Sequence, residues 1–242
     1  GSIISEEGTY SSGQIKYGTP ITAPGVSLAG YTGSFKNFTG TMPAQDITYK
    51  VVWMPQKVAY HVMYRYREND TDPTFTTLCS QRFEALAGSV VEASSEIPAS
   101  QTEAREKVAN GYVKPLSRAE KIAGDGSTII IYDYELAKYH LSYDFSGGSA
   151  TTTSYAPSGD YACGKQLQIP LLSQVKKTGY TPIGWYDTGD PDQKIVEGQF
   201  IEMGSRDVTY KLRWKPVTYT ITYDLALEGA ENPFNPGQYQ IG

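Results

Sequence analysis

The two histidines are the first side chains to test for chemistry, because histidine is the usual general acid or base near neutral pH and a common metal ligand. His61 and His140 occupy the same place in two similar segments, YHVMY and YHLSY, and Thr220 replaces them in a third, YTITY. In each segment this position lies on the polar side of an alternating pattern. We therefore interpret both histidines as exposed strand residues rather than catalytic or metal-binding ones.

Short catalytic motifs are missing from the sequence. It contains no G-x-S-x-G, H-E-x-x-H, C-x-x-C or phosphate-binding glycine loop, and such patterns are what usually place a nucleophile, a metal or a phosphate. We predict a protein that is not an enzyme, with no catalytic residue and no cofactor. A deep pocket that holds a carboxylate of strongly shifted pKa would revive the enzyme hypothesis.

Two acidic turns resemble calcium loops at first sight. Their oxygen-bearing residues are Asn69, Asp70 and Asp72 in ENDTDP, and Asp187, Asp190 and Asp192 in DTGDPD. Calcium takes about six to eight oxygens from a shaped loop, and neither stretch continues to the central Gly and the bidentate Glu of an EF-hand. Because Asp, Asn, Gly and Pro are also ordinary turn residues, we favour plain turns and predict no metal site, with calcium binding as the alternative.

The elements that carry these residues repeat along the chain. The segments are ITYKVVWMPQKVAYHVMYRY (47–66), IIIYDYELAKYHLSYDF (129–145) and VTYKLRWKPVTYTITYDL (208–225). Tyr60, Tyr139 and Tyr219 occupy the same place in them and recur about every 80 residues, which indicates tandem units. In each segment apolar and polar residues alternate with period 2, as expected of a strand with one buried face.

One strand therefore closes a unit and the next opens its successor. The joints between them are short: Met54, Pro55 and Gln56 in one, Lys215 and Pro216 in another. Because proline fixes φ and donates no hydrogen bond, we predict stiff joints. The boundaries divide the chain into residues 1–56, the closing part of a unit; 57–137; 138–215; and 216–242, the opening strand and turn of a further unit.

The two middle units differ in their predicted helices. In 57–137, Ser100 and Glu103 form an S-x-x-E capping box, so we predict a helix over 101–110 that ends at Gly111. In 138–215 a shorter amphipathic helix is expected over 171–177, ended by Gly179. Cys79 and Cys163 fall at similar places in these two units, too far apart for the roughly 7 Å Cα limit of a disulfide, so we predict that they are not bridged.

Charge and hydropathy exclude several classes of partner. The net charge of −5 and the isoelectric point of about 5.1 leave no broad basic surface, so we expect no nucleic acid partner. No apolar run approaches the roughly 18 residues of a membrane helix, and no signal peptide opens the sequence. Gly1-Ser2 is typical of an expression scar. The out-of-phase ends predict head-to-tail self-association through an unpaired strand edge.

Longer motifs resemble two families. KTGYTPIGWYD (177–187) precedes RDVTYKLRWKPVTYTITYDL, and LAGYTGSFKNFTGTMPAQDITYKVVW spans 28–53. These segments resemble the Listeria-Bacteroides repeat, the B-repeat of internalin-type surface proteins. Residues 57–137 lack GWY, but NGY (110–112), LAGSVVEAS (86–94) and the long helix resemble a mucin-binding-protein (MucBP) repeat. Both resemblances imply an α+β, strand-rich fold of tandem small β-grasp-like repeat modules in an elongated array on the bacterial cell surface.

Aromatic residues are the remaining binding candidates. Tyr60, Tyr64, Tyr139, Tyr143, Tyr219 and Tyr223 could stack on sugars, but they share a face with core residues, so a half-buried sheet core is favoured. Tyr180, Trp185 and Tyr186 lie in predicted turns, and in the resembling family this element is a packing motif. A Lys–Asn isopeptide crosslink, known among such surface modules, would need a buried Lys, Asn and carboxylate in contact. Any ligand-binding residues remain unassigned.

Two functions follow from these patterns. The first is a non-enzymatic structural or adhesive segment of an extracellular bacterial surface protein, acting as a stalk or spacer with host contact. The alternative is a receptor module for a mucin, a glycan or a host protein, centred on residues 57–137. A spacer binds nothing saturably, whereas a receptor loses its binding when one surface of 57–137 is mutated.

Overall fold

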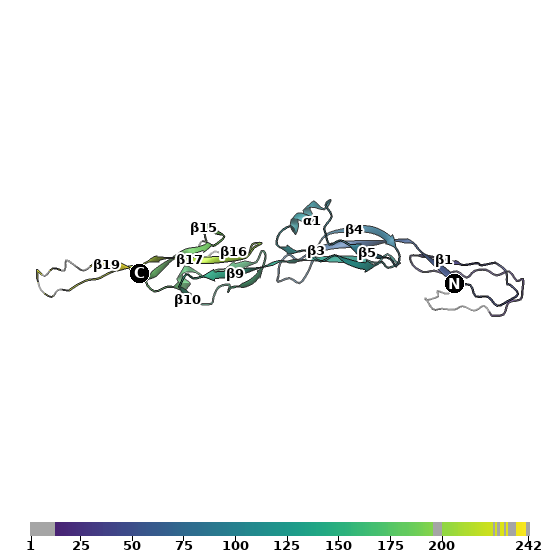
Figure 1. The fold of residues 1–242 in the computed structure, drawn as a ribbon, viewed down its shortest axis with the longest axis horizontal. Helices are drawn as coiled ribbons and strands as arrows, with labels where there is room; N and C mark the ends of the chain where they lie inside the picture. The colour runs from purple at the N-terminus through teal and green to yellow at the C-terminus, as the bar shows by residue number, and fades with distance from the viewer. Residues whose placement is uncertain are drawn as a thin grey trace. The chain divides into compact units, whose positions relative to one another are not determined.

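The computed structural model describes residues 13–195, 200–224, 226, 228–229, 231 and 236–240, and these residues are rich in strands (Figure 1). They divide into two compact units. The first contains the described residues up to Tyr66 together with Thr74–Lys107 and Lys114–Tyr134. The second contains Arg67–Pro73, Val108–Val113 and the described residues from Glu135 onward. The strand-rich fold class predicted from the sequence is confirmed.

A four-stranded sheet with the order β4-β3-β8-β6 occupies the middle of the chain. Its strands are β3 (Lys57–Tyr66), β4 (Thr76–Leu86), β6 (Tyr112–Val113) and β8 (Ile129–Leu136). The central strands β3 and β8 run parallel, and each has an antiparallel neighbour on its other side. A separate antiparallel pair joins β5 (Val90–Ala93) to β7 (Arg118–Lys121). Before this sheet, β1 (Tyr31–Phe35) and β2 (Val51–Pro55) form an antiparallel pair.

A five-stranded sheet follows, with the order β11-β9-β17-β14-β15. Its strands are β9 (Lys138–Asp144), β11 (Gly159–Ala162), β14 (Tyr180–Asp187), β15 (Asp190–Ile195) and β17 (Val208–Pro216). Short pairs join β10 (Ser149–Ala150) to β13 (Val175–Lys176), β12 (Gln166–Gln168) to β16 (Phe200–Glu202), and β18 (Thr218–Thr220) to β19 (Gln238–Gln240). Here too the central strands, β9 and β17, run parallel. Both sheets thus place an opening strand beside a closing strand.

Tyrosines on one face of the four-stranded sheet account for much of its core. Val62, Tyr64 and Tyr132 are only 2–3% exposed. The hydroxyl of Tyr64 donates to the carbonyl of Ser94 at 3.0 Å, and that of Tyr132 donates to the carbonyl of Ala93 at 2.6 Å. Burial raises the pKa of the Tyr64 phenol to about 12, which keeps it a donor. Tyrosine suits this core because its ring is buried and its hydroxyl satisfies a backbone carbonyl.

Both predicted helices are shorter than the sequence suggested. Helix α1 spans Thr102–Lys107, and the chain then turns toward Gly111, whose φ is +78°. The prediction of a helix over 171–177 is wrong. Only a 3-10 turn forms at Leu172–Gln174 (η1), because the Gln174 side chain accepts a hydrogen bond from the Leu171 N–H at 2.9 Å and buried Val175 extends into β13. No helix in the described residues is long and apolar enough to span a membrane.

Candidate functional site: the strand joints

The two histidines lie on the outward side of their strands. His140 is exposed, and its Nδ1 lies 2.7 Å from the carboxylate of Asp160. His61 is half-buried and donates its backbone N–H to the carbonyl of Thr128 at 3.0 Å. Within the described ranges, no group of three or more His, Cys, Asp or Glu side chains is arranged to hold a metal ion.

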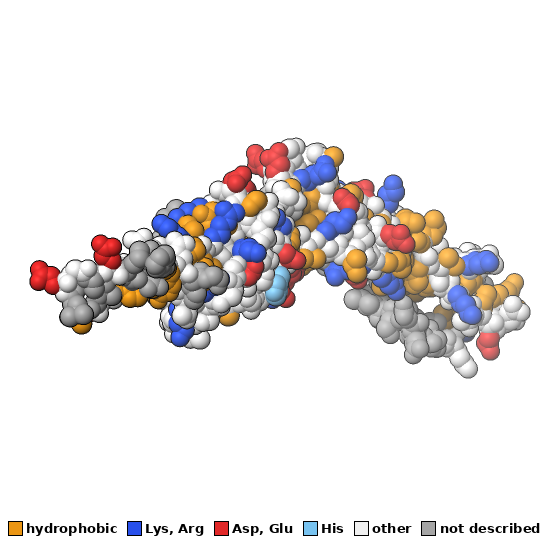
Figure 2. Space-filling model, turned by 60° about the vertical axis from the view of Figure 1, so that its left-hand side comes forward, with side chains coloured by type: hydrophobic (Ala, Val, Ile, Leu, Met, Phe, Trp, Pro, Cys, Tyr) orange, Lys and Arg blue, Asp and Glu red, His pale blue; other side chains and the backbone are white. Residues whose placement is uncertain are grey.

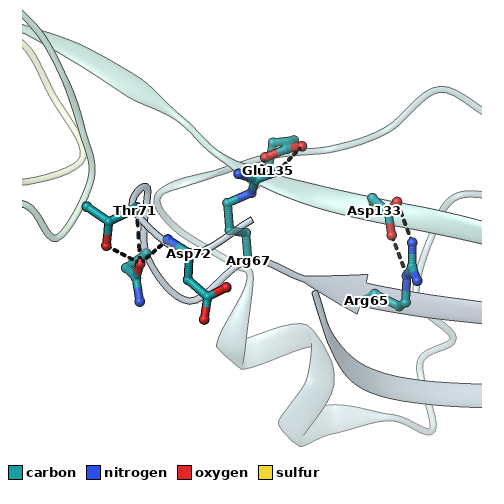
Figure 3. Close-up of polar contacts among 7 residues, drawn as sticks. Arg65, Arg67, Thr71, Asp72, Asp133 and Glu135 are labelled. Carbon is teal, nitrogen blue, oxygen red and sulfur yellow. Dashed lines mark hydrogen bonds and ion pairs between the residues drawn. The ribbon is translucent and has the colours of Figure 1, made fainter. Parts of the chain in front are cut away.

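The acidic turns use their oxygens within the protein. The side-chain oxygen of Asn69 accepts from the backbone N–H groups of Thr71 at 3.1 Å and Asp72 at 2.8 Å, an Asx turn drawn in Figure 3. Asp70 forms an ion pair with Lys165 at 2.7 Å. Asp187 is 4% exposed and is paired with Arg206. The geometry therefore supports plain turns at both places.

Trp185, the two cysteines and a possible isopeptide crosslink are the other features singled out from the sequence. Trp185 is buried and donates its indole N–H to the carbonyl of Pro170 at 2.8 Å, so it is a core residue. Cys79 and Cys163 are free thiols, and burial raises the pKa of Cys79. The buried polar side chains among the described residues are Ser95 and Asp187, so no buried lysine there could form an isopeptide bond.

A recurring arrangement appears instead at the joints between strands. At the first joint, the carbonyl of Gly30 accepts from the N–H of Gln56 at 2.7 Å. The carbonyl of Gln56 in turn accepts from the N–H of Ala87 at 2.9 Å, in the turn between β4 and β5. One linker residue is thus tied to the hairpin before it and to the sheet after it.

The second joint, inside the second compact unit, repeats this pattern with other residues. The carbonyl of Gly111 accepts from the N–H of Ala137 at 2.8 Å, and the carbonyl of Ala137 accepts from the N–H of Cys163 at 2.9 Å. At a third place, the carbonyl of Gly179 accepts from the N–H of Val217 at 2.9 Å. A linker residue fixed on both sides has little freedom to swing.

Glycine is required at these joints by backbone shape and by space. Gly30 has φ +77°, and a Cβ there would lie 2.5 Å from the carbonyl oxygen of Gly124 and 2.7 Å from the Cβ of Ala87. Gly111 has φ +78°, and its Cβ would lie 2.6 Å from the Sγ of Cys163. Both glycines combine a left-handed conformation with close contact.

Tyrosine follows each joint glycine. The hydroxyl of Tyr31 lies where a Cβ on Gly88 would point. Tyr112 is half-buried, and its pKa is raised chiefly by burial and further by Glu68 and Cys163. Tyr180 lies under the ammonium of Lys177, 4.3 Å from the ring centre. These tyrosines therefore contact different neighbours at the three places.

In each sheet, an ion pair on the outward face joins the two parallel strands. In the four-stranded sheet, Arg65 bonds both carboxylate oxygens of Asp133, at 2.7 and 2.8 Å (Figure 3). In the five-stranded sheet, Lys211 lies 3.2 Å from Asp144. The signs are opposite, because the opening strand is basic in the first sheet and acidic in the second. On the face drawn in Figure 2, basic and acidic side chains are interspersed.

The sequence predicted joints at 54–56 and at 215–216 but not the contacts made there. It assigned their stiffness to proline, whereas the linker residues Gln56, Ala137 and Val217 are held by backbone hydrogen bonds to glycine carbonyls. A usable signal was present, since Gly-Tyr occurs three times in the sequence, at 30–31, 111–112 and 179–180.

Comparison with known proteins adds no relative. No protein-family model matches the chain, and no curated protein matches it.

Proposed function

We propose that this chain is a non-enzymatic stalk or spacer segment of an extracellular bacterial surface protein, built of tandem β-grasp-like modules. The observation that carries the proposal is the repeated joint, in which one linker residue is hydrogen-bonded on both sides and a glycine permits close packing. A spacer has to keep the segments that it joins in a fixed relative position, and a joint with few free torsions does this.

The strand order supports the β-grasp-like part of the proposal. In both sheets the opening strand lies parallel to the closing strand, and an antiparallel strand of the same module flanks the opening one on its other side, β4 beside β3 and β11 beside β9. The intervening chain carries α1 in one module and η1 in the other. A parallel pair of opening and closing strands with a helical turn between them supports a β-grasp-like module.

Joint stiffness can be measured directly at the second joint. Spin labels at A109C and T153C, both exposed sites, in a C79S/C163A background would report the distance across it by pulsed electron spin resonance. We expect one narrow distance distribution. A distribution as broad as that of a flexible linker would refute the spacer function.

A receptor role is the second candidate, and exposed apolar side chains in the middle module favour it. Leu116 is 90% exposed and Val90 is 65% exposed, both on loops or edges around β5 and β7. Exposed apolar groups of this kind are common at protein-binding surfaces. Saturable binding to immobilised mucins or host glycans that is lost in V90S/L116S would support a receptor, and flat responses from the unmodified chain would exclude it for that panel.

A further inference from the structure

Among the residues that the structure describes, one opening strand and one closing strand lack the parallel neighbour that their counterparts have. In the two larger sheets, β3 lies beside β8 and β9 lies beside β17. Strand β18 begins the third opening segment, yet its only ladder partner among the described residues is β19. Strand β2 ends the first closing segment, and within the described part of the chain it pairs with β1 alone.

Apolar side chains on these two segments are correspondingly exposed. Ile47 is 39% exposed, whereas Ile130, at the same place in the four-stranded sheet, is 0% exposed. Tyr223 is 41% exposed, whereas its counterpart Tyr64 is 3% exposed. Each segment therefore presents part of a sheet core to solvent, and such an edge favours strand pairing.

Charge decides which strand fits beside which. In the four-stranded sheet the register partners Tyr64 and Tyr132 are followed by Arg65 opposite Asp133. In the five-stranded sheet Tyr143 and Tyr210 are followed by Asp144 opposite Lys211.

The two unpaired segments match the second of these patterns. Tyr223 is followed by Asp224 and Tyr49 is followed by Lys50. Thr222 and Thr48 precede the tyrosines, as Ser142 and Thr209 do in the five-stranded sheet. There the two hydroxyls lie 2.7 Å apart. Against the closing strand of the four-stranded sheet, Asp224 would instead face Asp133, a like-charge contact.

We propose that residues 220–224 of one copy pair in parallel with residues 46–50 of a second copy, with Tyr223 beside Tyr49 and Asp224 beside Lys50. The pairing buries Ile47 and Tyr223 and completes the central strand pair of a further sheet. Because the two surfaces differ, the contact is head to tail and produces open chains of molecules. This assembly does not depend on the proposed spacer role.

Charge reversal across the contact tests the pairing. Sedimentation velocity over a range of protein concentrations should show concentration-dependent chains. K50D alone and D224K alone should each weaken association by about fivefold to tenfold, as an exposed attractive pair becomes repulsive. The double variant K50D/D224K should restore most of it. K16D and E228K make the same charge changes at exposed sites outside the proposed register and should leave association unchanged.

A disulfide trap tests the register. In a C79S/C163A background, T48C and T222C placed in separate chains and mixed should form an intermolecular disulfide on mild oxidation, whereas K36C with T222C should not. A mass that stays that of one chain at all concentrations overturns the proposal, as do reversal variants that behave like K16D. In a further variant that carries T48C and T222C on one chain, oxidation should link chains to one another, and a disulfide within the single chain would also overturn the proposal. Unchanged circular dichroism of the variants shows that their effects come from the contact.

Discussion

The four-stranded and five-stranded sheets share a strand order but stabilise it differently. The first relies on tyrosines whose hydroxyls donate to backbone carbonyls, as in the bond from Tyr132 to Ala93 at the end of β5. The second is centred on Trp185, whose ring packs against Tyr143 and Phe145 with centroid distances of 5.4 and 5.2 Å. One strand order thus accepts two core chemistries, because the backbone ladder and the burial of one face are common to both.

Removal of the tryptophan should have the largest effect and should separate the two sheets. W185A deletes a ring that is 1% exposed together with its hydrogen bond to Pro170. We expect it to destabilise the five-stranded sheet by about 3–5 kcal/mol. Segment-resolved hydrogen exchange should show lost protection in β9 and β17 and retained protection in β3. Equal loss in both sheets would show that they unfold as one cooperative body.

The joints offer the second comparison. G30A would force a left-handed backbone and push a Cβ against the backbone of Gly124, which has no side chain to move away. G111A would meet the Sγ of Cys163, which can be removed. We expect chemical denaturation to show that G30A lowers the free energy of unfolding by about 2–4 kcal/mol and G111A by about 1–2 kcal/mol.

The cysteine supplies the control for this pair. Adding C163A to G111A should recover part of the lost stability, because the thiol is the atom nearest the new Cβ. The backbone strain at φ +78° would remain. No recovery would mean that strain, rather than contact with Cys163, dominates at the second joint.

The sequence predicted the strands better than the joints, for a physical reason. Alternation in 60–66 is a local property, and it placed Val62, Tyr64 and Tyr66 on the buried face. The bond from Gln56 to Gly30 joins residues far apart in the chain, and no local pattern encodes it. The failed helix over 171–177 is similar, because pairing of Val175 with Ala150 overrides the helical pattern.

Reversing the charge of Arg65 should lower stability moderately. It would test whether opposite charges on neighbouring strands favour their pairing. R65D places two carboxylates opposite each other in the four-stranded sheet, since Asp133 is its register partner. We expect a loss of about 1–2 kcal/mol in urea denaturation at low salt. R65D/D133R should regain most of it, and high salt should shrink the difference.

The same face of the five-stranded sheet gives a matched comparison. D144K/K211D reverses the Lys211–Asp144 pair, which lies at a longer distance of 3.2 Å and is about half exposed. The single variants D144K and K211D should therefore lower the free energy of unfolding by less than R65D does. Equal costs in both sheets would argue that the paired charges contribute only through repulsion and not through the bidentate bond of Arg65.

The smallest expected effect is a pH dependence confined to the five-stranded sheet. The pKa of Asp144 is lowered by the backbone N–H of Ser146 and by Lys211. A carboxyl whose folded pKa lies below its unfolded value adds stability above the unfolded pKa, and this stability disappears as the pH falls through the folded one. As the pH is lowered, the melting temperature of the five-stranded sheet should therefore fall slightly more in the unmodified chain than in D144N, which lacks the titrating group. Because the Asp144 side chain is 45% exposed, solvent screening keeps the difference small. D192N, at another exposed carboxyl of the same sheet, is the control. An identical acid response in D144N and the unmodified chain would remove Asp144 from the account of this sheet's stability.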